Sequence, residues 1–334
     1  LVAWGLSTIF SVTRVYSLET LIFFLLYIYF FFLAADLGRW PWLIELLINA
    51  IIATAGLVWM FGLLQLSWWY QGKIPGASTD IVPRLSVLGN PNTMASYIAL
   101  VIPLVLYKLL IVRYRITRLL LVLWLAMLVA MIGLTRSRGG LMGMFVAVSF
   151  FCSVWLINER RLWAFLRRKR LTGWPVRFWW TVSALGLLVL AGGLIFLLNI
   201  QGVEQSLNVR LRMGQAALLT WQQYPLIGSG LGTLGQLSLQ SWVPGTTVWA
   251  DAHNLFLTLA AETGILGLIS LLWLVLVALG VVWRYYQRIP AGHCHLAGTA
   301  CLASWLGFTV HNLVDYLVKY PVIMIHLTLL GGLW

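Results

Sequence analysis

Residues 18–37 read LETLIFFLLYIYFFFLAADL, and this stretch decides the fold class of the 334-residue chain. An α-helix crosses the hydrocarbon layer of a membrane with about 20 apolar residues. The apolar residues here do not alternate with polar ones, so the pattern indicates a helix and not a barrel strand. Eight further segments share this character, and the sequence predicts an all-α, polytopic integral membrane protein with about nine transmembrane helices. The predicted segments are 18–37, 43–66, 93–112, 119–135, 140–157, 178–200, 264–283, 296–312 and 319–334.

The composition extends this conclusion to the whole chain. Hydrophobic residues make up 61% of it and charged residues only 9%, which is too apolar for a water-soluble core. A net charge of +13 is also typical of proteins that bind nucleic acid, but here the basic residues stand between the predicted helices. We therefore predict the lipid bilayer as a partner, and no nucleic acid.

The basic residues alternate between the two ends of the predicted helices. Connections rich in Lys and Arg face the cytoplasm by the positive-inside rule. This places residues 1–17 outside. We predict one membrane domain, 1–334, that lacks N-terminal spans, and their number is odd if the full protein starts in the cytoplasm. The inside group is Arg39, Lys108, Arg113, Arg115, Arg118, Arg160, Arg161, Arg167, Arg168, Lys169, Arg170, Arg177, Arg284 and Arg288, and the outside group is Arg14, Lys73, Arg84, Arg136, Arg138, Arg210, Arg212 and Lys319.

Two of the outward connections are long. The first, 67–92, is rich in turn-forming residues and ends in Gly89-Asn90-Pro91-Asn92. The second, 201–263, contains apolar residues at helical spacing from Val203 to Tyr224, before Pro225 stops the pattern. Long structured connections between membrane helices often carry function, so we expect the site on this side.

Five outward arginines are candidates for binding a diphosphate. A guanidinium group binds phosphate oxygens through two parallel hydrogen bonds and stays charged at physiological pH. The alternative is that each arginine pairs with a lipid headgroup or a nearby aspartate. Two of them occupy a predicted tight turn on the side where positive charge is normally depleted. The five are Arg84, Arg136, Arg138, Arg210 and Arg212.

His253 is the candidate general base. It stands in Asp251-Ala252-His253-Asn254, where the second long connection returns to the membrane, and an imidazole accepts a proton near neutral pH. The alternative is an interfacial histidine beside an aspartate, Asp251, that caps the next helix. Glu262 follows on the same helix at the membrane boundary, where an acid is usually paired or functional. We expect it to form a salt bridge with one of the arginines.

Other polar groups have simpler interpretations. Asn90 and Asn92 flank Pro91 at the start of a predicted span, a pattern that also fits helix capping. His311 and Asp315 are four residues apart and are predicted to share a helix face.

Two further motifs are assigned no binding role. His293-Cys294-His295 lacks further ligands, so no metal site is predicted. The glycines of Gly228-Ser229-Gly230-Leu231-Gly232 follow no strand, so we interpret them as a close backbone turn and not as a nucleotide site.

Four motifs in this order resemble the O-antigen ligase and polymerase family of bacterial membrane glycosyltransferases. The resemblance extends from about Trp4 to the end of the chain. One departure is Gly214, which stands where the family usually has a tryptophan and leaves open whether Arg210 or Arg212 is the matching arginine. The motifs are Arg84 with Gly89-Asn90-Pro91-Asn92-Thr93-Met94-Ala95, Ser137-Arg138-Gly139-Gly140-Leu141, Arg210 with Pro225-Leu226-Ile227-Gly228-Ser229-Gly230-Leu231-Gly232, and His253-Asn254 with Glu262-Thr263-Gly264.

The resemblance implies a metal-independent enzyme of the bacterial inner membrane, without cofactor, whose active site faces outward. Such enzymes move a glycan from an undecaprenyl-diphosphate donor to a hydroxyl of a glycan, lipid or protein acceptor during cell-envelope synthesis. It further implies that Arg138 and Arg210 contact the diphosphate, with Arg84 a further candidate, and that His253 activates the acceptor. The alternative function is a small-anion transporter of the bicarbonate type. No internal repeat or pair of broken helices supports the transporter in the sequence.

Overall fold

The computed structural model describes residues 1–73, 87–158, 203–240, 251–288 and 293–333. Every regular element in these ranges is a helix, so the all-α fold class is confirmed. The helices are α1 (Val2–Ile9), α2 (Arg14–Leu37), α3 (Pro41–Tyr70), α4 (Pro91–Ile111), α5 (Arg115–Thr135), α6 (Arg138–Asn158), α9 (Val203–Gln223), α10 (Leu234–Gln240), α11 (Leu255–Arg288), α12 (His293–His311) and α13 (Pro321–Gly332).

Most of the predicted spans coincide with helices, but the number of nine is not confirmed. Segment 178–200 lies outside the described residues, and α13 has only 12 residues, which is short for a full crossing. In the described part of the chain, six helices are long and apolar enough to cross a membrane: α2, α3, α4, α5, α6 and α11.

Contacts divide the chain into two compact units, and α3 and α12 contribute residues to both. Unit 1 comprises Leu1–Ala53, Glu204–Pro290 and Phe308–Trp334. In it, α2 packs against α13 and α1, and α1 also packs against α11. Close approach of α2 and α13 depends on small residues, because a side chain at Gly332 would collide with the backbone of Phe31 and with Ala34.

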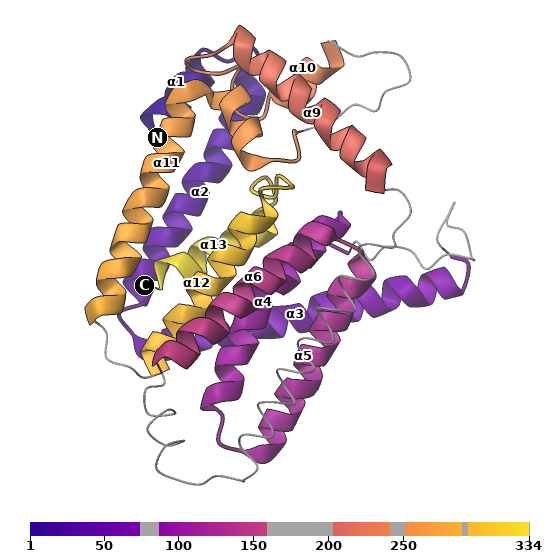
Figure 1. The fold of residues 1–334 in the computed structure, drawn as a ribbon, viewed down its shortest axis with the longest axis vertical. Coiled ribbons are helices and arrows are strands. Elements are labelled where there is room, and N and C mark those ends of the chain that lie inside the picture. The colour runs from indigo at the N-terminus through magenta and orange to yellow at the C-terminus, as the bar shows by residue number, and fades with distance from the viewer. Residues whose placement is uncertain (74–86, 159–202, 241–250, 289–292, 334) are drawn as a thin grey trace. The chain divides into compact units, whose positions relative to one another are not determined.

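Unit 2 comprises Thr54–Val203 and Ala291–Gly307, and α4 is its centre. In its most apolar stretch 78% of α4 is buried, against 17% for α5, because α5 and α6 pack against it (Figure 1). Ala95 of α4 lies where a side chain at Gly140 of α6 would be, so the two helices pack closely at this point. Ser304 donates a hydrogen bond to the Leu100 carbonyl over 2.6 Å.

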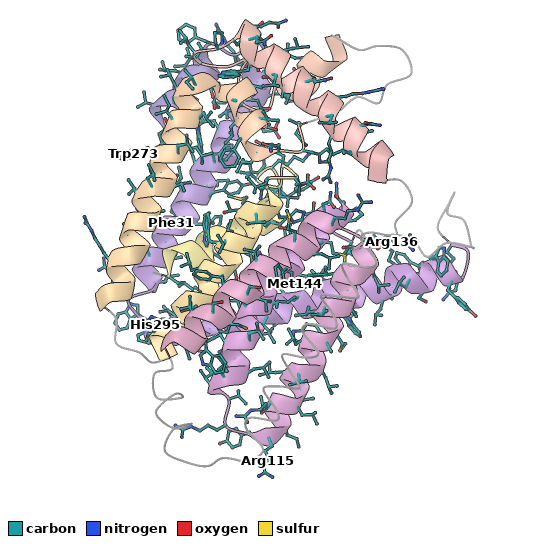
Figure 2. The ribbon with its side chains drawn as sticks, viewed as in Figure 1. Phe31, Arg115, Arg136, Met144, Trp273 and His295 are labelled. Atoms are coloured by element: carbon teal, nitrogen blue, oxygen red, sulfur yellow. The ribbon has the colours of Figure 1, made fainter. Side chains whose placement is uncertain are left out.

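Local sequence explains where the helices of unit 2 begin and end. The Asn90 side chain accepts a hydrogen bond from the Asn92 amide over 2.7 Å and caps α4, with Pro91 as its first residue. The capping interpretation of this motif is therefore confirmed. Figure 2 shows Arg115 and Arg136 at opposite ends of α5, as the alternation of basic residues predicted.

Candidate active site

His253 lies immediately before α11 and forms a short hydrogen bond with Asp315. Its Nδ1 is 2.7 Å from the Asp315 Oδ1, and the two side chains are 26% and 5% exposed. The backbone of His253 is left-handed, with φ of 46°, which is uncommon for a residue with a side chain. The Asp251 side chain compensates, because its Oδ1 accepts the His253 amide hydrogen over 2.8 Å.

Asp315 reaches His253 because the chain leaves the helical path after α12. The prediction that His311 and Asp315 share a helix face is wrong, since α12 ends at His311. Asn312 redirects the chain: its carbonyl accepts the Leu255 amide hydrogen over 3.0 Å, and its side chain accepts that of Leu317 over 2.9 Å. These bonds attach the α12–α13 connection to the start of α11.

The hydrogen bond between His253 and Asp315 shifts the pKa of both groups. It is the largest influence on His253 and raises its pKa above the usual 6.5, although burial lowers the pKa. Burial raises the pKa of Asp315, but the bond and the charge of His253 outweigh burial and hold that pKa below 3.8. Asp315 is therefore ionised at neutral pH and accepts the Nδ1 hydrogen, which leaves the Nε2 lone pair of His253 to accept a proton.

Asp251 forms an ion pair with Lys319, whose ammonium donates to Asp251 Oδ2. Burial lowers the pKa of Lys319, but the charge of Asp251 outweighs burial and raises it above 10.5. The interpretation of Asp251 as the cap of α11 is wrong. Asn254 has that role, because its Oδ1 accepts the Leu257 amide hydrogen over 2.9 Å.

Arg210 lies on the face of α9 that packs toward the start of α11. Helical periodicity puts it on the same side as buried Met213 and Ala217, which are three and seven residues later. Arg210 is half-buried, and its charge lowers the pKa of His253, so the two groups interact. Arg212 points elsewhere and is exposed. Of the two arginines, Arg210 is the one whose charge acts on the histidine.

Arg136 and Arg138 lie in the turn between α5 and α6. Arg136 adopts φ of 53° and ends α5, and Arg138 is the first residue of α6. A helix N-terminus disfavours cations, so an arginine there is costly unless an anion binds beside it. Across the described ranges, neither side chain forms an ion pair with a carboxylate. Arg84 lies outside those ranges.

Glu262 lies two residues before a break in α11 at Gly264, where φ is 63° and ψ is −167°. Its Oε1 accepts the Leu234 amide hydrogen at the start of α10 over 3.3 Å. Its carbonyl accepts hydrogen bonds from Ser7 and Gly230 over 2.6 Å and 2.9 Å. The predicted salt bridge is wrong for the described arginines: Oε1 accepts a backbone N–H, and the buried Oε2 has no hydrogen-bond partner among the described residues.

The glycine-rich turn packs directly against the α11 break. The Ser229 amide donates to the Ala261 carbonyl over 3.0 Å, and the Ile265 amide donates to that of Pro225 over 2.9 Å. A side chain at Gly228 would collide with the Glu262 backbone. The interpretation of these glycines as a close backbone turn is confirmed.

The O-antigen ligase sequence model matches residues 123–272, the segment that contains Arg138, Arg210 and His253. The match covers 150 of the 334 residues and supports the resemblance to the O-antigen ligase family. No curated protein sequence matches the chain at a significant level. The family resemblance seen in the sequence is thereby confirmed.

The four motifs of this O-antigen ligase segment and its surroundings come together as two pairs. In unit 2 the motif that contains Asn92 meets the Ser137–Leu141 motif, where Ala95 contacts Gly140. In unit 1 the glycine-rich turn meets Glu262-Thr263-Gly264, and Arg210 interacts with His253. Each pair therefore brings a motif that contains an arginine into close contact with another motif.

Two polar residues of the site, Asp315 and Lys319, lie beyond the O-antigen ligase match and were not predicted as site residues. Both lie in the connection between α12 and α13. An unpaired carboxylate or ammonium group so close to a predicted span is energetically costly. The presence of these two charges therefore predicts that each has a partner elsewhere in the chain.

Asp251, His253 and Asp315 have ligand atoms within 4.8 Å of one another, close enough to hold a metal ion. Their donors already have partners, because Lys319 binds Asp251 and a hydrogen bond joins His253 to Asp315. A divalent cation would have to displace an ammonium and a proton. The arrangement therefore suits proton transfer better than metal coordination.

Proposed function

We propose that the chain is a membrane glycosyltransferase that moves a glycan from an undecaprenyl-diphosphate donor to an acceptor hydroxyl, at the outer face of the bacterial inner membrane. The observation that carries the proposal is the hydrogen-bonded pair of His253 and Asp315. His253 lies immediately before a membrane-length helix, and the charge of Arg210 acts on it. The family match supports the reaction class. No observation in the described residues supports the transporter.

His253 is the general base of the proposed reaction. Its Nε2 takes the proton of the acceptor hydroxyl while that oxygen attacks the anomeric carbon of the donor sugar. The bond from this carbon to the diphosphate oxygen breaks, and undecaprenyl diphosphate leaves with the bonding electrons. Attack from the face opposite the leaving group inverts the anomeric centre. Asp315 stabilises the imidazolium that forms.

Arg138 and Arg210 are the proposed ligands of the diphosphate, with Arg84 and Arg136 as further candidates. Negative charge grows on the leaving diphosphate as the bond breaks, so fixed guanidinium groups stabilise the transition state more than the ground state. Arg138 and Arg210 lack carboxylate partners in the described ranges, which leaves their charge available to a substrate. No metal or nucleotide has a role in this proposal.

Transfer in proteoliposomes tests the proposal. The assay supplies an undecaprenyl-diphosphate oligosaccharide and a panel of glycan, lipid and protein acceptors, and follows glycan transfer and release of the lipid diphosphate. We expect His253→Ala to abolish both. Arg210→Ala should lower the rate by about 100-fold to 1,000-fold, as loss of a charge-stabilising donor does.

Arg212→Ala is the matched control, because Arg212 lies on the same helix and is exposed. It should retain most of the activity. Equal rates for Arg210→Ala and Arg212→Ala would remove Arg210 from the site. A folded wild-type protein that leaves every donor intact would overturn the proposal.

A further inference from the structure

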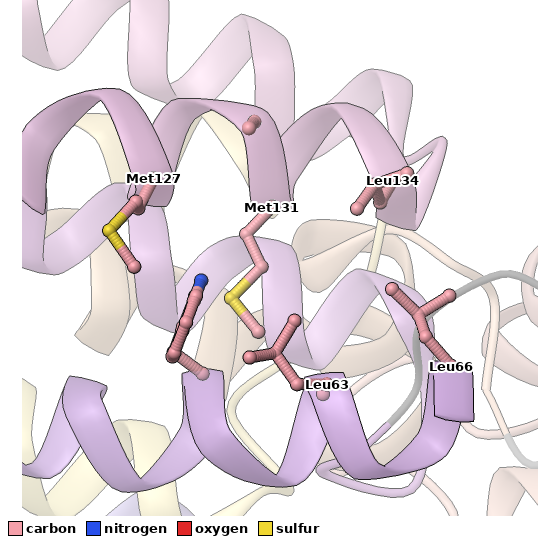
Figure 3. A pocket seen from close by; sticks show the side chains of 8 residues that line it. Leu63, Leu66, Met127, Met131 and Leu134 are labelled. Carbon is pink, nitrogen blue, oxygen red and sulfur yellow. The ribbon is translucent and has the colours of Figure 1, made fainter. Parts of the chain in front are cut away.

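The cavity between α3 and α5 in unit 2 has a volume of about 240 Å³ and an apolar lining. Figure 3 shows Leu63 of α3 pointing toward Met131 of α5. No charged or titratable side chain of the described residues lines this cavity, so it offers no group for acid–base chemistry. A buried titratable group that the proposed reaction does not use lies instead in unit 1. This group is His311, at the end of α12.

The two carboxylate oxygens of Asp315 differ in their hydrogen bonds. Oδ1 lies 2.7 Å from His253 Nδ1 and also accepts the Tyr316 amide hydrogen over 2.8 Å. Oδ2 is buried and has no hydrogen-bond partner among the described residues. An ionised carboxylate accepts hydrogen bonds through both oxygens, and a buried oxygen without a donor is costly. Oδ2 therefore requires a donor from a neighbouring group.

His311 has a buried nitrogen that also lacks a partner. The residue is 1% exposed, and its Nδ1 has no hydrogen-bond partner in the part of the chain that the structure describes. A charged imidazole would be costly at this burial, so the ring is neutral and carries one N–H. The chain turns directly after α12, where the Val314 amide donates to the His311 carbonyl over 3.1 Å, and the charge of Asp315 acts on His311.

The other cationic groups that interact with Asp315 already have partners. The interacting groups are His253, His311 and Lys319. His253 binds Oδ1, and the Lys319 ammonium donates to Asp251. Arg210 on α9 acts on both histidines, and Asp251 acts on His253. His311 is therefore the neighbour that can supply the missing donor.

We infer that His311 is a positioning residue for the general base, an inference that rests on the proposed function. Its Nδ1–H donates a hydrogen bond to Asp315 Oδ2, so the carboxylate is held between two imidazoles. The second bond fixes the direction in which Oδ1 faces His253. It also divides the negative charge of Asp315 between two donors, and so limits how strongly Asp315 retains a proton on His253. No proton passes to His311 in the reaction.

Nuclear magnetic resonance of the histidine rings tests the inference without catalysis. The chain has five histidines, so ring signals from ¹⁵N-labelled protein in detergent can be assigned by comparison with single variants. His311→Leu removes the donor and should raise the pKa of His253 by roughly one pH unit, because the charge of Asp315 then acts on His253 alone. His311→Asn keeps a side-chain N–H in the position of Nδ1 and should leave that pKa close to the wild-type value.

The same variants in the transfer assay show whether the bond matters for the reaction. His311→Leu should move the acid limb of the rate profile to higher pH, since a general base must be deprotonated. It should also lower kcat by roughly 10-fold to 100-fold with little change in KM, because the base is less well oriented. His311→Asn should restore most of the rate.

His326→Leu is the matched control. His326 is a half-buried histidine of the same unit, and its Nδ1 already lies 2.6 Å from the Val322 carbonyl oxygen. This variant should change neither the titration of His253 nor the acid limb. Thermal melting of each variant in detergent separates loss of folding from loss of positioning.

Two results would overturn the inference. One is a pKa of His253 that is the same in the wild type, His311→Leu and His311→Asn. The other needs no folded variant at position 311: a ¹⁵N signal showing that Nδ1 of His311 carries no hydrogen in the wild type. If the titration shifts as expected while the wild type transfers no donor, the proposed function fails and the bond between His311 and Asp315 stands.

Discussion

His253 is held from two sides by carboxylates with different tasks. Asp251 binds the backbone amide of His253 and so stabilises a left-handed conformation that costs roughly 1 kcal/mol or more. Asp315 binds the ring and sets which nitrogen carries the hydrogen. The ion pair with Lys319 keeps Asp251 charged and occupied, so the two carboxylates do not compete for the ring. Orientation and protonation of the histidine therefore depend on separate contacts.

The pH dependence of transfer tests the role of Asp315. A general base works when deprotonated, so the acid limb of the wild-type rate profile should lie above pH 6.5, where the pKa of His253 is raised by Asp315. In Asp315→Asn the largest raising influence on that pKa is lost and only the charge of Asp251 still raises it, while burial and Arg210 lower it, so the limb should move to lower pH. The maximal rate should also fall by about 100-fold to 10,000-fold, because Asp315 no longer stabilises the imidazolium. A limb that stays in place would argue against this pairing.

Removal of the Lys319 charge should destabilise the fold. Lys319→Met leaves the Asp251 carboxylate 4% exposed and without its cation, which we expect to cost about 1–3 kcal/mol. We expect a smaller destabilisation than for a fully buried ion pair, because Lys319 itself is 35% exposed. Thermal unfolding in detergent measures the loss.

The double variant Asp251→Asn/Lys319→Met is the control for this prediction. Its amide oxygen can still accept the His253 amide hydrogen, while both charges are absent. The double variant should be more stable than Lys319→Met alone. If the single variant is as stable as the wild type, the ion pair makes no contribution to folding.

Helix α11 has two structural roles and is broken at Gly264. Its first turns carry Glu262 toward α10, and the stretch Leu255–Ala278, which includes these turns, is apolar and long enough to cross a membrane. At Gly264 the helical hydrogen-bond ladder is interrupted, and the carbonyls of Ala261 and Glu262 bind the glycine-rich turn instead. A break with a second segment bound to it fixes the direction in which the start of α11, and so His253, points.

Gly264→Ala should destabilise the protein by about 2–4 kcal/mol, measured by thermal unfolding. The backbone conformation of Gly264 is one that only glycine adopts readily, and an added side chain would collide with the Leu226 carbonyl. Gly280→Ala on the same helix has open space around the new side chain and should instead stabilise by about 0.5–1 kcal/mol. Equal effects at both positions would show that the break is not needed.

Helix α9 shows how an element selects one of two neighbouring arginines. A step of two residues along a helix rotates a side chain by about 200°, so Arg210 and Arg212 cannot share a face. The buried side of α9 includes Met213 and Ala217, and Gly214 lets Leu257 approach to 3.4 Å of its Cβ position. A larger side chain at position 214 would compete with Leu257 for this space.

The orientation of the whole molecule follows from its basic residues and is a prediction. Tyr70 at the end of α3 should face outward, and Tyr114 in the connection between α4 and α5 should face the cytoplasm. Both side chains are exposed, 86% and 79%, so a cysteine at either position should react with a thiol reagent.

Labelling of cells with a membrane-impermeant maleimide tests this orientation. The background has Cys152, Cys294 and Cys301 replaced by serine. Tyr70→Cys should be labelled in intact cells, and Tyr114→Cys only after the cells are opened. The reverse pattern would invert the topology and place His253 on the cytoplasmic side.

Most of the long helices, the cap of α4 and the family resemblance could be predicted from the sequence, because the information is local. Apolar runs of spanning length predict α2, α3, α4, α5 and α6, and Pro225 ends α9 close to its predicted end. The positions of His253, Arg138 and Arg210 within short motifs were also sufficient for the family. Segment length was the main source of error, since apolar composition near the end of the chain continues beyond the 12 residues of α13.

By itself the sequence determined a helical membrane protein with basic residues at alternating ends and a histidine at a membrane boundary, because hydrophobicity, charge and capping act over a few residues. Only the tertiary structure decided the partners of that histidine. Asp315 is 62 residues from His253, and Lys319 is 68 residues from Asp251. Such pairings arise where the chain leaves its helices, at the end of α12 and the start of α11, and no local pattern specifies which turns will meet. These charged side chains are paired because an unpaired charge beside the membrane is energetically too costly.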